Sequence, residues 1–250
     1  MSNATSILLL SGDAEARLLV DGDAAVAAVF GEREVRLIRA WATRPDWLDA
    51  AAAPPPQALI RSGALPDIDV RALLDEPHRL VIFSLLPAVA LPALRHESGG
   101  AFLAHRALRA GWSPEMAAMV AECREESPLS PSDAVAALEP HIERLQARGS
   151  TVAVCTAFRR VVEPLEYRSH GGMPSLRDRI RSLNLEMARL SQRTGCFVLD
   201  LDRPLAQEGG ASLDADCFGG DGRAAEIALD EFAALLMDAL PDDFMSAEVS

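Results

Sequence analysis

Lysine is absent from the 250-residue sequence, so its positively charged side chains are arginines. This absence excludes a Walker-type phosphate loop, Schiff-base chemistry and a lysine general base, because each of them needs the amine. The formal net charge is −13 at pH 7. Such an excess of acidic groups disfavours a nucleic-acid groove and an anionic membrane surface. We therefore expect neither nucleic acid nor a membrane as a partner.

Cysteine is scarce, and no two cysteines form a Cys-x-x-Cys pair, which excludes a zinc knuckle or a thioredoxin motif. The longest apolar run, residues 80–94, is too short to cross a bilayer and is interrupted by Ser84, Pro87 and Pro92. The first residues lack a basic stretch followed by a long apolar one, so no signal peptide is predicted. The expected location is a reducing cytoplasm.

Hydrophobic residues make up 49% of the chain, which is enough for a large core. Short apolar runs predict five β-strands that alternate with helical segments: residues 7–10, 34–38, 80–86, 151–155 and 196–199. The run 80–86 is apolar on both faces, which is typical of a central strand in a parallel sheet, and we expect 7–10 beside it. The pattern predicts a three-layer, doubly wound, flavodoxin-like α/β fold with about five parallel strands.

Capping residues and glycines mark the predicted helices. Ser130 precedes a helix that is expected to end at Gly149, and Ser175 precedes one that ends at Gly195. The spacing of apolar residues predicts the buried face of this second helix: Leu176, Ile180, Leu183, Met187 and Leu190. Shorter or later helices are predicted at residues 24–30, at 70–74, after Ser113 and from about Asp221.

The remaining connections show no internal repeat and no linker, so one domain is expected over residues 1–241, followed by a flexible tail at 242–250. Residues 95–100 combine charge with glycine and are expected to form a loop. Residues 102–106 are expected to be helical.

The first apolar run stops at Ser11-Gly12-Asp13. A buried strand followed by a tight turn gives this pattern. In open α/β sheets the ligand crevice is built from the loops at the carboxyl ends of the strands. Ser11, Gly12 and Asp13 are therefore candidate site residues.

The chain resembles the SGNH (GDSL-type) hydrolases over most of its length. In that family the first strand ends in Gly-Asp-Ser, whose serine is the nucleophile. Gly12-Asp13 matches this motif, but Ala14 follows. The family has an oxyanion-hole asparagine after the third strand, where this chain has Ser84. The family serine and asparagine are thus both replaced.

The family also has an Asp-x-x-His motif just before the last helix. Asp214 or Asp216 matches the aspartate, but no histidine follows His170. A base would then have to come from a loop, and His96 and His170 both follow strands on the expected ligand side. Each of them has a plainer interpretation as a solvated loop histidine, and Ser11 has one as a turn serine that bonds to backbone amides.

The resemblance implies an esterase or acyl-transfer enzyme that acts on a small ester or an acylated carbohydrate, with no cofactor and no metal. Ser11 would be a displaced nucleophile, with Asp13, Asp216 and His96 or His170 as the other catalytic groups. The missing family residues leave a second interpretation open. In it, the protein is a catalytically silent member of the same fold that binds or assembles with a protein partner.

Arginines follow the third and fourth predicted strands, and Arg95 and Arg168 are the candidates to bind an anionic group of the substrate. The alternative is a set of surface ion pairs. Asp13 and Asp216 would meet over the sheet edge, where two carboxylates raise the pKa of one of them or hold a divalent cation, although no spacing is diagnostic of a metal. The alternative is that each carboxylate caps a turn or helix.

The segment Asp200-Leu-Asp202 imitates the Asp-x-Asp motif of haloacid-dehalogenase phosphatases. In that family the motif opens the fold and a lysine follows downstream. Here the motif closes the predicted sheet and the chain has no lysine, so we reject this interpretation. Asp202 remains a residue that can face the crevice.

Overall fold

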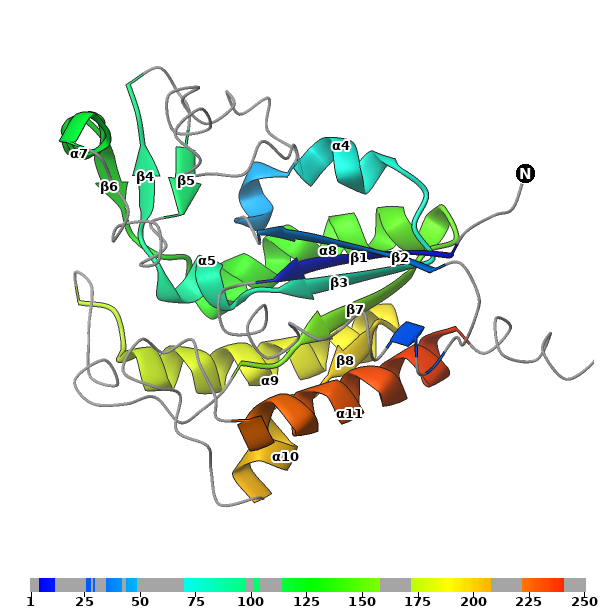
Figure 1. Ribbon diagram of the computed structural model, residues 1–250. Coiled ribbons are helices and arrows are strands. Elements are labelled where there is room, and N and C mark those ends of the chain that lie inside the picture. The colour runs from blue at the N-terminus through cyan, green and yellow to red at the C-terminus, as the bar shows by residue number, and fades with distance from the viewer. Residues whose placement is uncertain are drawn as a thin grey trace, which may run out of the picture.

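The computed structural model describes residues 5–11, 26–27, 29, 35–41, 44–48, 70–97, 101–103, 114–157, 172–207 and 222–240. Its main sheet has five strands in the order β2-β1-β3-β7-β8, and every neighbouring pair is parallel (Figure 1). These strands are β1 (Thr5–Ser11), β2 (Val35–Trp41), β3 (Leu80–Ser84), β7 (Thr151–Cys155) and β8 (Phe197–Leu199). This is the flavodoxin-like order, so the predicted α/β fold, with β3 central and β1 beside it, is confirmed.

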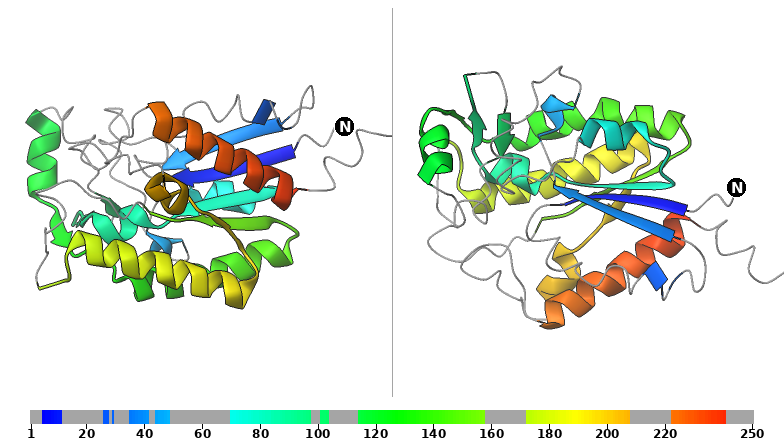
Figure 2. Two further views of the ribbon diagram at one scale, coloured as in Figure 1. Left: turned by 90° about the horizontal axis from the view of Figure 1, so that it is seen from below. Right: turned by 45° about the horizontal axis from the view of Figure 1, so that its top comes forward.

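Helices cover both faces of this sheet. Figure 2 shows α8 (Pro131–Ala147) and α9 (Leu176–Thr194) on one face and α11 (Gly222–Ala239) on the other. All five residues of β3 are buried, as are residues 7–10 of β1. A strand between two helical layers has no solvent-facing side, which explains why these runs are apolar without alternation.

Helix α9 begins after Ser175, ends at Gly195 and buries the face that the sequence predicted. The Ser175 hydroxyl accepts a hydrogen bond from the backbone N–H of Asp178 at 3.2 Å, and Gly195 ends the helix with a φ of 73°. That left-handed conformation is one that glycine adopts without steric cost. The predicted apolar stripe is buried, with Leu183 and Leu190 fully inaccessible.

The apolar run 80–86 is divided between two elements, which corrects the predicted strand. Strand β3 ends at Ser84, and Leu86 begins the short helix α5 (Leu86–Ala90). Pro87 lies in the first turn of α5. Proline cannot donate to a strand ladder, but its fixed φ suits a first helical turn, so the chain turns there.

A second, antiparallel sheet was not predicted. Its order is β5-β4-β6, built from β5 (Ala101–Leu103), β4 (Ala93–Arg95) and β6 (Arg124–Glu126). The predicted loop from Arg95 and the predicted helix at 102–106 are therefore wrong at Arg95 and at 102–103. Strands of three residues are too short for a period-two pattern to appear in the sequence. We call β4, β5 and β6 together the small sheet.

Helices α4 (Val70–Asp75) and α7 (Pro114–Ala121) lie where the sequence predicted helices. The short helices η1 (Pro45–Trp47) and α10 (Asp202–Gln207) were not predicted. Val26, Ala27 and Val29 are helical, as expected for that segment, and the predicted tail 242–250 lies outside the described residues. Over the described ranges, no helix has the length and apolar character needed to span a membrane.

Replacing Leu183 by alanine is expected to lower the free energy of unfolding by about 2–4 kcal/mol, because the side chain is fully buried in the core. Chemical denaturation measures the loss. The matched control is Leu185→Ala on the same helix, where the side chain is 53% exposed and a change within about 0.5 kcal/mol is expected. Equal losses for the two variants would contradict the assigned helix face.

Candidate active site

The carboxyl ends of the five parallel strands form one edge of the main sheet, at the left in Figure 1. We call it the carboxyl edge. Leu10 of β1 is level with Phe83 of β3, so the next residues, Ser11 and Ser84, end adjacent strands side by side. In folds of this type, ligands bind outside this edge where the strand order reverses, which here lies between β1 and β3. The candidate site is therefore at Ser11 and Ser84.

Most of the predicted site residues fall outside the part of the chain that the structure describes. Only the backbone of Ser11 is described, at the end of β1. The predicted residues outside the description are Gly12, Asp13, Arg168, His170 and Asp216. Their roles stay predictions.

Ser84 is the one predicted site residue found within the carboxyl edge with its side chain described, and it is buried. It borders a small hollow that is otherwise lined by apolar or proline side chains: Leu10, Pro45, Leu48, Phe83, Leu85 and Leu138. The hollow has room for about one water-sized group. Its size and lining suit a small apolar group.

Arg95 and His96 lie at the end of β4, on the small sheet. The Arg95 Nε donates a hydrogen bond to Glu126 Oε1 at 2.6 Å, and this bond lowers the pKa of the Glu126 carboxyl below its ordinary value. His96 Nε2 lies 3.9 Å from Glu122 Oε2. The surface ion pair that was the alternative for Arg95 is thus present.

A polar cluster at the ends of β7 and β8 was missed by the sequence analysis. The Thr156 hydroxyl oxygen accepts hydrogen bonds from the backbone N–H groups of Leu201 and Asp202, at 2.9 and 3.1 Å. It donates to Asp200 Oδ1 at 3.0 Å. A hydroxyl has one donor and two lone pairs, so Thr156 is fully satisfied and fixes the chain after β8 to the chain after β7.

Asn184 of α9, on one face of the main sheet, also belongs to this cluster. Its Oδ1 accepts from the Ala157 N–H at 2.9 Å, and its Nδ2 donates to the Ala157 carbonyl at 2.7 Å. Nδ2 also lies 3.4 Å from Asp202 Oδ2. Asp202, a buried carboxylate, is thus held at the carboxyl edge, and the sequence suggested that it could face this crevice.

Arg179, also on α9, is a buried guanidinium that no sequence pattern marked. Its Nη1 donates to the carbonyl oxygen of Val89 in α5, and burial lowers the pKa of Arg179. Because α5 directly follows Ser84 and Leu85, this bond fixes the segment that leaves the central strand.

Metal binding finds no support in the described ranges, where no three histidine, cysteine, aspartate or glutamate side chains gather in a way that could hold an ion. The polar groups that the structure brings together at the carboxyl edge are hydroxyls, amides and single carboxylates. These suit hydrogen bonding to a neutral or polar ligand.

Comparisons with known proteins show the same fold. No protein-family model and no curated protein sequence matches the chain. LAE5, an α/β hydrolase from the metagenome of Lake Arreo, Spain, is 12% identical with a TM-score of 0.53, over 93% of this chain and 94% of that one. A lipase/acylhydrolase from Enterococcus faecalis is 16% identical with a TM-score of 0.53, over 94% and 96% of the two chains.

A third structure is Axe2, an acetylxylan esterase from Geobacillus stearothermophilus, at 10% identity and a TM-score of 0.53, over 96% of this chain and 97% of that one. The likeness runs through almost the whole of both chains in each comparison. The chain therefore has the α/β fold of these hydrolases, which is the fold that the resemblance to SGNH hydrolases implied.

Thr156→Val is expected to destabilise the protein by about 1–3 kcal/mol, because it removes the hydroxyl that accepts buried hydrogen bonds from the Leu201 and Asp202 amides. Valine keeps the shape of threonine, so the loss reports the hydroxyl. Thr156→Ser, which retains that hydroxyl, is the control and is expected to lose less than half as much in a denaturant titration. A valine variant as stable as the serine variant would show that the hydroxyl does not hold the edge together.

Proposed function

We propose that the protein is an SGNH-type ester hydrolase or acyl-transfer enzyme with a rearranged active site at the carboxyl edge. The observation that carries the proposal is the placement of Ser11 and Ser84 at the ends of adjacent central strands. They lie at the point where strand order reverses, in a fold shared with three hydrolases over nearly the whole chain.

Ser11 is the proposed nucleophile, and it lies three residues before the position of the family serine, which Ala14 occupies here. Its hydroxyl attacks the ester carbonyl carbon, and a base takes the hydroxyl proton; His170 or His96 is the candidate. The alkoxide of the ester then leaves with a proton, and water hydrolyses the acyl-enzyme. Asp13 and Asp216 are proposed to orient and balance the charged base.

The negative charge on the carbonyl oxygen requires donors at the carboxyl edge. Gly12 and Ser84 are proposed to supply them, because they follow or end the two adjacent strands. Arg95 and Arg168 are proposed to bind an anionic part of the substrate, and for Arg95 this requires exchange of its bond to Glu126. No metal or cofactor takes part in this scheme.

The proposed substrate is a small ester or an acylated carbohydrate with a short acyl group. The hollow beside Ser84 supports the short acyl group, because its room and apolar lining suit a methyl-sized end such as that of an acetyl group. The names of two fold neighbours, an acetylxylan esterase and a lipase/acylhydrolase, agree with ester chemistry.

A second candidate function is binding without catalysis, and it is favoured by the residues that stand where SGNH hydrolases have their catalytic groups. Ala14 stands where the family has its nucleophile, and no histidine follows His170. A protein with these changes would keep the fold and bind a ligand or a protein partner without turnover.

Chromogenic short-chain esters, with phosphoesters as a control, separate the two candidates. We expect turnover of the acetate ester and none of the phosphoester. Ser11→Ala and Asp13→Ala are expected to lower kcat by about 100-fold or more, as loss of a nucleophile or of a group that supports the base does. Matched controls are Ser182→Ala and Asp230→Ala, which alter exposed helix positions.

Each result has a stated meaning. Full activity in Asp13→Ala removes that residue from the mechanism, and full activity in Ser11→Ala removes the proposed nucleophile. Absence of turnover by the folded wild-type protein contradicts the enzyme proposal and leaves the silent, binding function.

A further inference from the structure

The small sheet stands beyond the carboxyl ends of the main strands (Figures 1 and 2). The chain leaves the central strand β3 at Ser84, passes through α5 into β4, and comes back from β6 into the first turn of α8. Both connections lie at the carboxyl edge. The small sheet therefore lies next to the candidate site.

The small sheet has a hydrophobic cluster that is separate from the main core: Ala93, Ala101 and Leu103 together with Trp47. Trp47 alone in this cluster comes from outside the small sheet, because it belongs to η1, which follows the edge strand β2. Burial of its apolar indole therefore attaches the small sheet to the rest of the protein.

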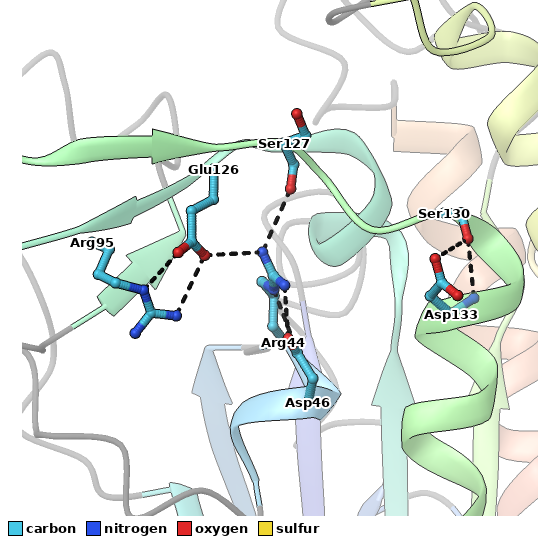
Figure 3. A network of polar contacts seen from close by, with 7 residues as sticks. All are labelled: Arg44, Asp46, Arg95, Glu126, Ser127, Ser130 and Asp133. Atoms are coloured by element: carbon cyan, nitrogen blue, oxygen red, sulfur yellow. Dashed lines mark hydrogen bonds and ion pairs between the residues drawn. The ribbon is translucent and has the colours of Figure 1, made fainter.

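Arg44 provides a second link between the two parts (Figure 3). It is buried and holds Asp46 through two hydrogen bonds of 3.0 and 2.7 Å. Across to the small sheet, its Nη1 lies 3.6 Å from Glu126 Oε2 and 3.5 Å from the carbonyl oxygen of Ser127. The guanidinium also lies 5.0 Å from the centre of the Trp47 ring.

Two features weaken the contact that Trp47 and Arg44 make with the small sheet. The Trp47 Nε1 is buried without a hydrogen-bond partner among the residues that the structure describes. The ion pair between Arg44 and Glu126 is longer than a direct hydrogen bond. Opening of the small sheet would let water satisfy the indole N–H, so part of the cost of opening is offset.

We propose that the small sheet is a cap over the carboxyl edge, closed by Trp47 and by the Arg44–Glu126 ion pair, and that its opening decides how large a substrate reaches the site. The opening itself is independent of the proposed function. The effect on substrate size rests on the proposed esterase activity.

Two variants weaken the closed cap by different means. Glu126→Gln removes the charge that Arg44 faces. Trp47→Phe shortens the ring that is buried against the small sheet and leaves a space in its hydrophobic cluster, so it is also expected to open the cap. Glu126 accepts a hydrogen bond from Arg95 within the small sheet as well, so the matched control is Arg95→Gln, which removes that bond and keeps the Arg44–Glu126 pair.

Amide hydrogen exchange of the full chain, followed by mass spectrometry, tests the cap directly. Exchange of peptides that cover β4 and β5 is expected to be about fivefold faster in Glu126→Gln, as loss of a half-buried ion pair predicts, and faster than wild type in Trp47→Phe as well. Peptides from β3 should be unchanged. Unchanged β4 and β5 exchange in Glu126→Gln, or equal acceleration in Arg95→Gln, overturns the proposal.

The ratio of turnover of a long-chain ester to that of the acetate ester tests the effect on substrates. It is expected to rise in both Glu126→Gln and Trp47→Phe. If exchange changes as expected and no ester is turned over by any variant, the cap stands and the esterase function fails. If exchange changes and the ratio stays constant in an active enzyme, the control of substrate size is overturned.

Discussion

The central strand β3 is buried on every residue, with β1 on one side and β7 on the other. A strand buried in this way needs helices on both faces of its sheet, and parallel strands need crossovers to supply them. Those crossovers bring the end of every strand to one edge. The position of the candidate site beside Ser11 and Ser84 is a consequence of the burial of β3.

Two groups of polar contacts hold segments at the carboxyl edge. Thr156 and Asn184 fix the chain after β7 and β8 by hydrogen bonds that leave the hydroxyl fully satisfied. Arg44 and Trp47, which follow β2, contact the small sheet through a long ion pair, a long hydrogen bond to Ser127 and an indole whose N–H has no partner among the described residues. In the first group the Thr156 hydroxyl and the Asn184 amide are held by short hydrogen bonds. The second contains the features expected of a part that moves.

The main sheet could be predicted from the sequence because its signals are local. The double-sided apolarity of the run from residue 80, and the cap, stripe and glycine of α9, each lie within one segment. The small sheet could not be predicted, because three-residue strands carry no period and gain their stability from Trp47, which is distant in the sequence. Pro87 is a local signal for the end of β3, although the sequence analysis extended that strand to residue 86.

The candidate site was predictable only in part for the same reason. The end of the apolar run at Ser11-Gly12-Asp13 located the end of β1. Asn184, in contrast, lies in the middle of a helix, and its contacts with Ala157 arise only when the helix packs on the sheet. Arg95 was predicted from its place after a strand, yet its nearest partner, Glu126, comes from a strand that no pattern revealed.

The central claim is that an activated nucleophile lies at the carboxyl end of β1. Labelling of the folded protein with a fluorophosphonate, followed by peptide mass spectrometry, tests it most directly, since such reagents form a stable bond with activated serine hydroxyls. The account predicts one label, on Ser11, that is lost in Ser11→Ala and retained in Ser182→Ala. No label, or a label on a serine away from the carboxyl edge, would contradict it.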